Sequence, residues 1–213
     1  MAGSGREIRT VIDHLVLIKA HLLSLEAVLE RLGTAAYSPA GIVELRRGSL
    51  DVRMVVEELM LLSVAAHERS GQELADAIRT TYRADKKMRL LEQLNPNFFP
   101  DAIDLVPADQ PGLAGRFVDV QEEYLTASAA RSFYHQSDNM LHASWGYLGT
   151  SDFSTEVERL STFSRLAARL LRNFEVDISG TGFMVLGHIH LDSDLAPVAF
   201  DARTTGAGGI PAA

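Results

Sequence analysis

The sequence predicts an all-α protein, an antiparallel bundle of five to six helices with a small C-terminal β-hairpin. Apolar residues recur at spacings of three and four through most of residues 6–174, which is the period of helices that bury one face. Glycines and prolines interrupt this pattern where helices would stop or start. Only beyond residue 174 does the apolar period change to the two-residue alternation of strands.

Each expected helix is bounded by a capping residue, a glycine or a proline. The expected helices cover residues 6–32, 39–47, 50–68, 72–94, 116–145 and 152–174. Residues 50–68 are apolar on most faces, so we expect this helix at the centre of the bundle. Four of the seven prolines lie within residues 95–115, and this density predicts an irregular crossover that Phe98 and Phe99 pack against the bundle.

The order of elements predicts the domain organisation. We expect a flexible N-terminus over residues 1–5, a helical bundle domain over 6–174, a β-hairpin appendage over 175–203 and a disordered tail over 204–213. The hairpin consists of the segments FMVLGHIHLD and LAPVAFDA, which the turn DSD separates.

Composition excludes several classes of function. The chain has 20 Lys and Arg against 28 Asp and Glu, and a net charge of −8 argues against general coating of nucleic acid. It has no cysteine, so disulfides, thiol nucleophiles and Cys-ligated metals are excluded. No apolar export signal and no stretch of about 18 apolar residues occurs. We therefore expect a cytoplasmic protein without a membrane partner.

Motifs for the common cofactors are also absent. The chain has no glycine-rich phosphate loop, no nucleophile elbow and no GxGxxG, so nucleotide hydrolases and dehydrogenases of the common folds are excluded and no cofactor is expected. Ferritin-like iron chemistry needs Glu three residues before His, and none of the seven histidines has a carboxylate there.

The most informative segment is a polar stripe on the helix of residues 116–145. Its members follow one another at four, three, four and three residues: Arg131, His135, Asp138, His142 and Trp145. At 100° per residue they fall within roughly 80° of one helix face. Three interpretations are open: a solvated face with i,i+4 pairs, a buried structural network, or a cleft in which the carboxylate positions an imidazole for proton transfer.

A second candidate is Glu57 in the most apolar helix. Arg53 lies one helical turn before it, so an internal Arg53–Glu57 pair is one interpretation. The other places Glu57 across the bundle from His135 or His142, where it would orient the imidazole or accept a proton.

Two further clusters carry charge or metal-ligating groups. Basic side chains repeat over the end of the helix of residues 72–94: Arg79, Arg83, Lys86 and Lys87. They form either a local RNA-binding surface or the wet side of an amphipathic helix. In the hairpin, His188, His190 and Asp192 alternate, which suits a metal site or a packing and dimerisation surface, and the sequence leaves that choice open. No other metal site is expected.

The run from Tyr134 to Ser144 resembles the tyrosine, Ser or Asp, and histidine pattern of HEPN-like bacterial proteins, a helical-bundle superfamily found among toxins and abortive-infection proteins. The helix around Arg53 and the crossover at residues 94–100 are also similar, so the resemblance covers about residues 50–172. It implies a ribonuclease whose catalytic histidine follows an arginine after four to six residues. The positions so spaced after Arg131 are 136–138, and none is histidine.

Two functions from different classes follow. The first, which the resemblance implies, is an RNA-binding or RNA-cleaving protein of bacterial or phage conflict systems, with the stripe residues 131, 135, 138 and 142 as its site and Glu57 in support. The second is a non-enzymatic module that forms homo-oligomers or binds a cognate protein, with its hairpin extending a sheet in a neighbouring chain. The stripe lines a concave cleft in the first and is exposed or structurally paired in the second.

Overall fold

A computed structural model shows a mixed α/β fold and not the all-α bundle that the sequence predicts. It describes residues 4–34, 37–69, 78, 80–81, 83–107, 113–142, 152–178, 182–203 and 209–211. The helices in these ranges are α1 Ser4–Gly33, α2 Pro39–Arg69, α4 Ala84–Leu94, α5 Ala127–Leu141 and α7 Phe153–Arg172. The strands are β1 Asp101–Val106, β2 Leu113–Asp119, β3 Phe174–Ile178, β4 Phe183–His188, β5 Val198–Arg203 and β6 Gly209–Pro211.

The strands form one sheet in the order β5-β4-β3-β1-β2-β6, and every neighbouring pair is antiparallel. The expected hairpin is present as β4 and β5, which pair from His188 opposite Val198 to Phe183 opposite Arg203. It is one edge of a larger sheet, because β3 and β1 continue the pairing on its other side. Gly209–Pro211, within the segment expected to be a disordered tail, pairs with β2.

The prediction of an all-α fold was wrong because prolines were taken to exclude strands. Pro100 directly precedes β1 and Pro107 directly follows it, so both lie outside the hydrogen-bonded ladder and bound the strand. The expected helix over residues 116–145 was also wrong at its start. Residues 116–119 continue β2, and α5 begins only after Thr126, whose side chain accepts a hydrogen bond from the amide of Ala129.

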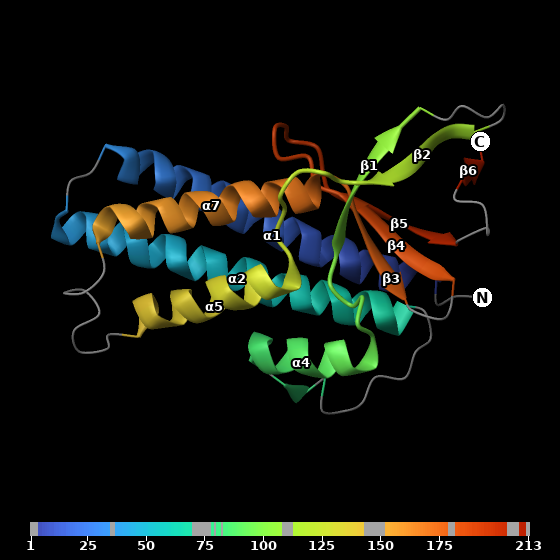
Figure 1. The fold of residues 1–213 in the computed structure, drawn as a ribbon, viewed down its shortest axis with the longest axis horizontal. Helices are drawn as coiled ribbons and strands as arrows, with labels where there is room; N and C mark the ends of the chain where they lie inside the picture. The colour runs from blue at the N-terminus through green and yellow to red at the C-terminus, as the bar shows by residue number, and fades with distance from the viewer. Residues whose placement is uncertain are drawn as a thin grey trace.

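The helix α2 replaces two expected helices because Gly48 does not end it. A Cβ at Gly48 would lie 2.7 Å from Cδ1 of Leu160, so glycine here allows α7 to approach α2 closely. Figure 1 shows α1, α2, α5 and α7 side by side, with the sheet toward one end of them and α4 beside α2. On the sheet, β5 packs on α1, β3 on α2, and β1 and β4 on α7.

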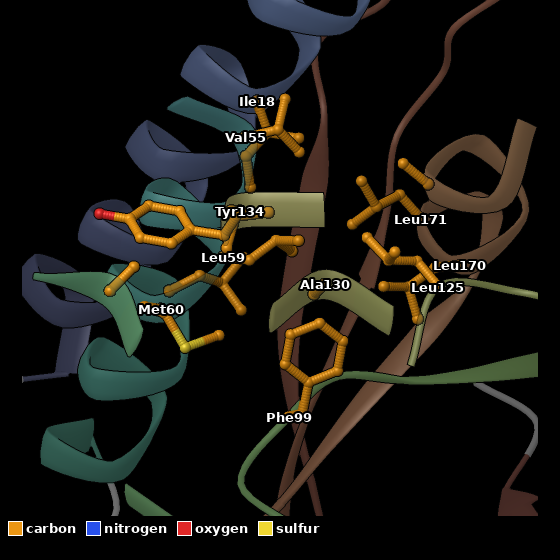
Figure 2. Packing of buried hydrophobic residues seen from close by; sticks show 14 of the residues in the cluster. Ile18, Val55, Leu59, Met60, Phe99, Leu125, Ala130, Tyr134, Leu170 and Leu171 are labelled. Atoms are coloured by element: carbon orange, nitrogen blue, oxygen red, sulfur yellow. The ribbon is translucent and has the colours of Figure 1, made fainter. Parts of the chain in front are cut away.

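The core confirms the central position expected for residues 50–68. Figure 2 shows Val55 and Leu59 of α2 between Ile18 of α1 and the side chains that α5 and α7 supply. The residues alternating along β3 are buried toward the helices, and Phe98 and Phe99 are buried as predicted. The helices and the sheet therefore share one core, which fixes α5 against α2 where the candidate stripe lies.

Candidate functional site

Some side chains of the stripe on α5 are paired within the protein, and others are exposed to solvent. Arg131 donates from Nη2 to Oε2 of Glu92 on α4 at 3.0 Å, and His135 is exposed. Asp138 is half-buried and faces α2, whereas His142 follows the last residue of the helix and its side chain is 77% exposed. Trp145 lies outside the described residues.

Four side chains close a network between α2 and α5, which we call the Arg53 network: Arg53, Glu57, Tyr134 and Asp138. Arg53 donates from Nε to Oε1 of Glu57 at 2.9 Å and from Nη1 to Asp138. The hydroxyl of Tyr134 donates to Oε1 of Glu57 at 3.3 Å, and the guanidinium carbon of Arg53 lies 5.1 Å from the centre of the Tyr134 ring. Glu57 therefore forms the internal pair that the sequence suggested.

Electrostatics favour the charged form of Arg53 and the neutral form of Tyr134. Burial works to lower the pKa of Arg53, but the hydrogen bond and the charges of its partners raise it overall. Burial and the charge of Glu57 raise the pKa of Tyr134, so its hydroxyl keeps its proton and donates. Both hydrogen bonds to Glu57, from Arg53 and from Tyr134, end on Oε1.

The structure brings only part of the expected site together. Nε2 of His142 lies 3.9 Å from Oδ1 of Asp138, and Arg53 binds the same oxygen of Asp138. A fixed carboxylate beside an exposed imidazole is an arrangement suited to proton transfer. Glu57 reaches this pair only through Arg53, and Arg131 points toward α4.

The basic residues expected on residues 72–94 do not share one surface. Arg83 is bound to Asp85 at 3.0 and 3.1 Å, and Lys86 is exposed. Lys87 is only 6% exposed, and burial lowers its pKa while the charge of Glu57 acts in the opposite direction. It faces the Arg53 network, not a partner in solution. Arg79 lies outside the described residues.

Two histidine–carboxylate pairs between α1 and α2 were not found by sequence reasoning. His14 contacts Glu58 at 2.7 Å between Nδ1 and Oε2, and His21 contacts Asp51 at 2.9 Å between Nδ1 and Oδ1. The spacing of these residues in the sequence could have indicated both pairs. The two histidines are seven residues apart on one helix and the two carboxylates seven apart on the next, which in antiparallel helices sets both pairs in register.

His67 of α2 is fully buried in a structural network. Its Nδ1 lies 2.7 Å from the carbonyl oxygen of Ser63 and its Nε2 lies 3.0 Å from Nδ2 of Asn95, which also donates to the carbonyl of Asp177 on β3 at 2.7 Å. Burial lowers the pKa of His67, so the ring is neutral, with the proton on Nδ1. This histidine joins α2, the end of α4 and the sheet.

The alternation of His188, His190 and Asp192 does not become a metal site. β4 ends at His188, so the later two residues lie in the turn that follows. Both nitrogens of His188 have protein partners, with Nδ1 at 2.8 Å from Oδ1 of Asn173 and Nε2 at 2.9 Å from Nδ1 of His190. Among the residues that the structure describes, no three His, Asp or Glu side chains are grouped as a metal would need.

Comparison of the chain with protein-family models, with curated proteins and with solved structures finds no match. None of the helices in the described ranges combines the length and the apolar character needed to cross a membrane.

Proposed function

We propose that this chain works by association with a second copy of itself and not by catalysis, through the strand β5 and the helix α1. One observation carries the proposal. Of the ten large apolar side chains exposed in the described residues, six belong to α1, to β5 or to the segment that leads into β5. We call these six the α1–β5 surface: Val16, Leu17, Leu23, Leu195, Val198 and Phe200.

The segment that leads into β5 is held against α1, whereas Val198 and Phe200 alternate with Ala199, which packs on the core, and so lie on the other face of β5. α1 packs on β5, and Nζ of Lys19 donates to the carbonyl oxygens of Ser193 at 2.6 Å and Leu195 at 2.9 Å. The lysine thereby fixes the segment before β5 against α1. An exposed apolar area of this kind is typical of an interaction site.

The end position of β5 in the sheet favours a second copy as the occupant. Within the described part of the chain no strand pairs with its outer edge. An edge strand exposes unpaired backbone groups, and antiparallel pairing of a strand with its own copy is self-complementary about a two-fold axis. Such an axis alongside β5 would also bring α1 toward α1 of the partner, because α1 packs on β5.

The outward face of α1 suits that arrangement. Val16, Ala20, Leu23 and Ala27 follow one another at four, three and four residues, the spacing of an apolar seam between two helices. Arg9 and Glu30 are exposed at opposite ends of α1, and an antiparallel helix pair would bring these opposite charges together. The polar stripe on α5 gives further support, since Arg131 and Asp138 are already paired within the chain.

The test compares Leu23→Glu and Phe200→Glu with a control, Val43→Glu, which places the same charge at a 63% exposed valine on α2. Light scattering after size-exclusion chromatography measures the mass of each. We expect a dimer for the unmodified chain and the control, and monomers with unchanged circular dichroism for the other two. A monomeric unmodified chain, or equal loss of dimer in the control, would refute the proposal.

The pairing of Asp138 with His142 favours a second candidate function, and we propose RNA as its substrate because the HEPN resemblance implies it. An exposed imidazole beside a fixed carboxylate suits removal of a proton from a ribose hydroxyl. Purified protein incubated with total RNA is compared with His142→Ala, Asp138→Asn and the exposed control Gln136→Ala. Cleavage that only the first two variants lose supports this function, and no cleavage by any folded form excludes it.

A further inference from the structure

A groove of about 660 Å³ lies between α7 and the segment that follows β4. Groups of both signs line it, and they come from three parts of the chain. Its charged and titratable lining consists of Arg165, Arg169, Arg172, His188, His190, Glu26 and Asp192. The groove is separate from the Arg53 network, and its interpretation does not depend on association of the chain.

The wall formed by α7 is cationic. Its three arginines are spaced by four and three residues, so they lie on one face of the helix. Arg169 is neutralised by Asp104 at 2.8 Å and by Glu122 at 2.6 Å. Arg165 makes only a long contact of 3.7 Å with Glu123, and Arg172 has no ion pair within the described residues. Arg165 and Arg172 are therefore the cations available to a ligand.

Two histidines that bind each other lie beside this wall. Nδ1 of His188 lies against the amide oxygen of Asn173, so it carries the proton and Nε2 accepts from Nδ1 of His190 at 2.9 Å. Burial, followed by His190 and the charge of Arg172, lowers the pKa of His188. An anion at this wall would offset the repulsion among these groups.

Two carboxylates also line the groove, Glu26 of α1 and Asp192 of the segment that follows β4. Burial raises the pKa of Glu26, and the charges of Asp192 and Glu30 raise it further. A bound ammonium group would offset the repulsion between Glu26 and Asp192. A simple anion would offset only the charge of the arginines, and a simple cation only the charge of the two carboxylates.

We propose that this groove binds a small zwitterion of the amino-acid class, with its anionic group at Arg165 and Arg172 and its ammonium group at Glu26 and Asp192. A groove of this volume accommodates such a molecule, and the cationic and anionic groups of the lining would set its orientation. The length of the ligand between its two charges would be the main determinant of affinity.

The test titrates the full chain calorimetrically with α-amino acids and with ω-amino acids of increasing length, using acetate, inorganic phosphate and methylammonium as single-charge probes. We expect one length of zwitterion to bind at least tenfold more tightly than any single-charge probe. Arg172→Gln and Glu26→Gln should each weaken it about tenfold, which corresponds to the loss of about 1.4 kcal/mol. Asp13→Asn, which changes an exposed carboxylate of α1 outside the lining, is the matched control.

Thermal unfolding of each variant establishes that it is folded. Three outcomes would overturn the proposal: no zwitterion binds, acetate or phosphate binds as tightly as the best zwitterion, or binding survives both lining substitutions. Equal weakening in Asp13→Asn would show that the general charge of α1, and not the groove, is being measured.

Discussion

Replacing Gly187 with alanine tests the packing of the sheet against the helices. A Cβ at this position would lie 2.2 Å from Cζ and 2.5 Å from Cε1 of Phe174, its cross-strand partner on β3. Carbon atoms pack at about 3.5–4.0 Å, so the ring must move by more than 1 Å, and Phe174 is fully buried. Overpacking typically costs about 1–3 kcal/mol. We expect Gly187→Ala to lose about 3 kcal/mol, because the ring of Phe174 is fully buried and cannot move into solvent.

The assay is urea unfolding of a double-mutant cycle. Phe174→Ala alone should lose about 3–5 kcal/mol, and adding Gly187→Ala to it should cost almost nothing, because the methyl group enters the space the ring has left. Gly33→Ala is the control, since a Cβ there meets nothing within 4 Å, and its stability should be unchanged or slightly higher. Additivity of the two substitutions within about 0.5 kcal/mol would refute the reasoning.

Three further predictions concern polar groups. The pKa of His67 is lowered from 6.5, so below that pH only the unfolded chain binds this proton and stability falls by up to about 1.4 kcal/mol per pH unit. Urea unfolding at about pH 7.5 and about pH 5.5 should show a smaller fall for His67→Gln. Arg53→Met leaves Glu57 and Asp138 without their cation and should lose about 1–2 kcal/mol, against under about 0.5 kcal/mol for the exposed control Arg47→Met. Tyr134→Phe removes the hydroxyl that donates to Glu57 and should lose about 0.5–1.5 kcal/mol. Equal losses in Arg53→Met and Arg47→Met, or no loss in Tyr134→Phe, would contradict the structural role of the network.

The helices could be predicted because their apolar spacing is the direct cause of their burial. Val11, Leu15, Ile18, Leu22 and Leu25 of α1 repeat at four, three, four and three residues, and each is at most 1% exposed. The spacing of apolar residues within one segment is therefore enough to predict such a helix. The pairing of β4 with β5 could be predicted for the same reason, because a hairpin forms between neighbouring segments.

The remainder of the sheet depends on contacts that local sequence does not encode. β1 pairs with β3 across a long separation in the chain, and only Ala102 and Ile103 of β1 are buried. A short strand with so few buried side chains lacks a clear two-residue period. The prolines on either side of β1 therefore favoured the prediction of an irregular segment. Prolines at the ends of a strand are nevertheless compatible with its pairing.

In the candidate site, too, contacts within one helix could be predicted from the sequence, and contacts between helices could not. The pair of Arg53 and Glu57 is one helical turn apart and was suggested by the spacing. The contact of Arg53 with Asp138 joins α2 to α5 and depends on how the two helices pack. Lys87 shows the same dependence, because a lysine on an amphipathic helix is expected in solvent until α4 is placed against the bundle.

The most direct test of the proposed association is cysteine cross-linking along β5. The natural chain has no cysteine, so a single one introduced there reacts only with its copy in another chain. Opposed positions of antiparallel strands near the two-fold axis have Cβ atoms about 4.5–5.5 Å apart, close to the separation a disulfide spans. We predict that Val198→Cys, Phe200→Cys or Ala202→Cys, whichever lies nearest the axis, forms a covalent dimer on mild oxidation. If none of the three cross-links more than Val43→Cys on α2, association through β5 is contradicted.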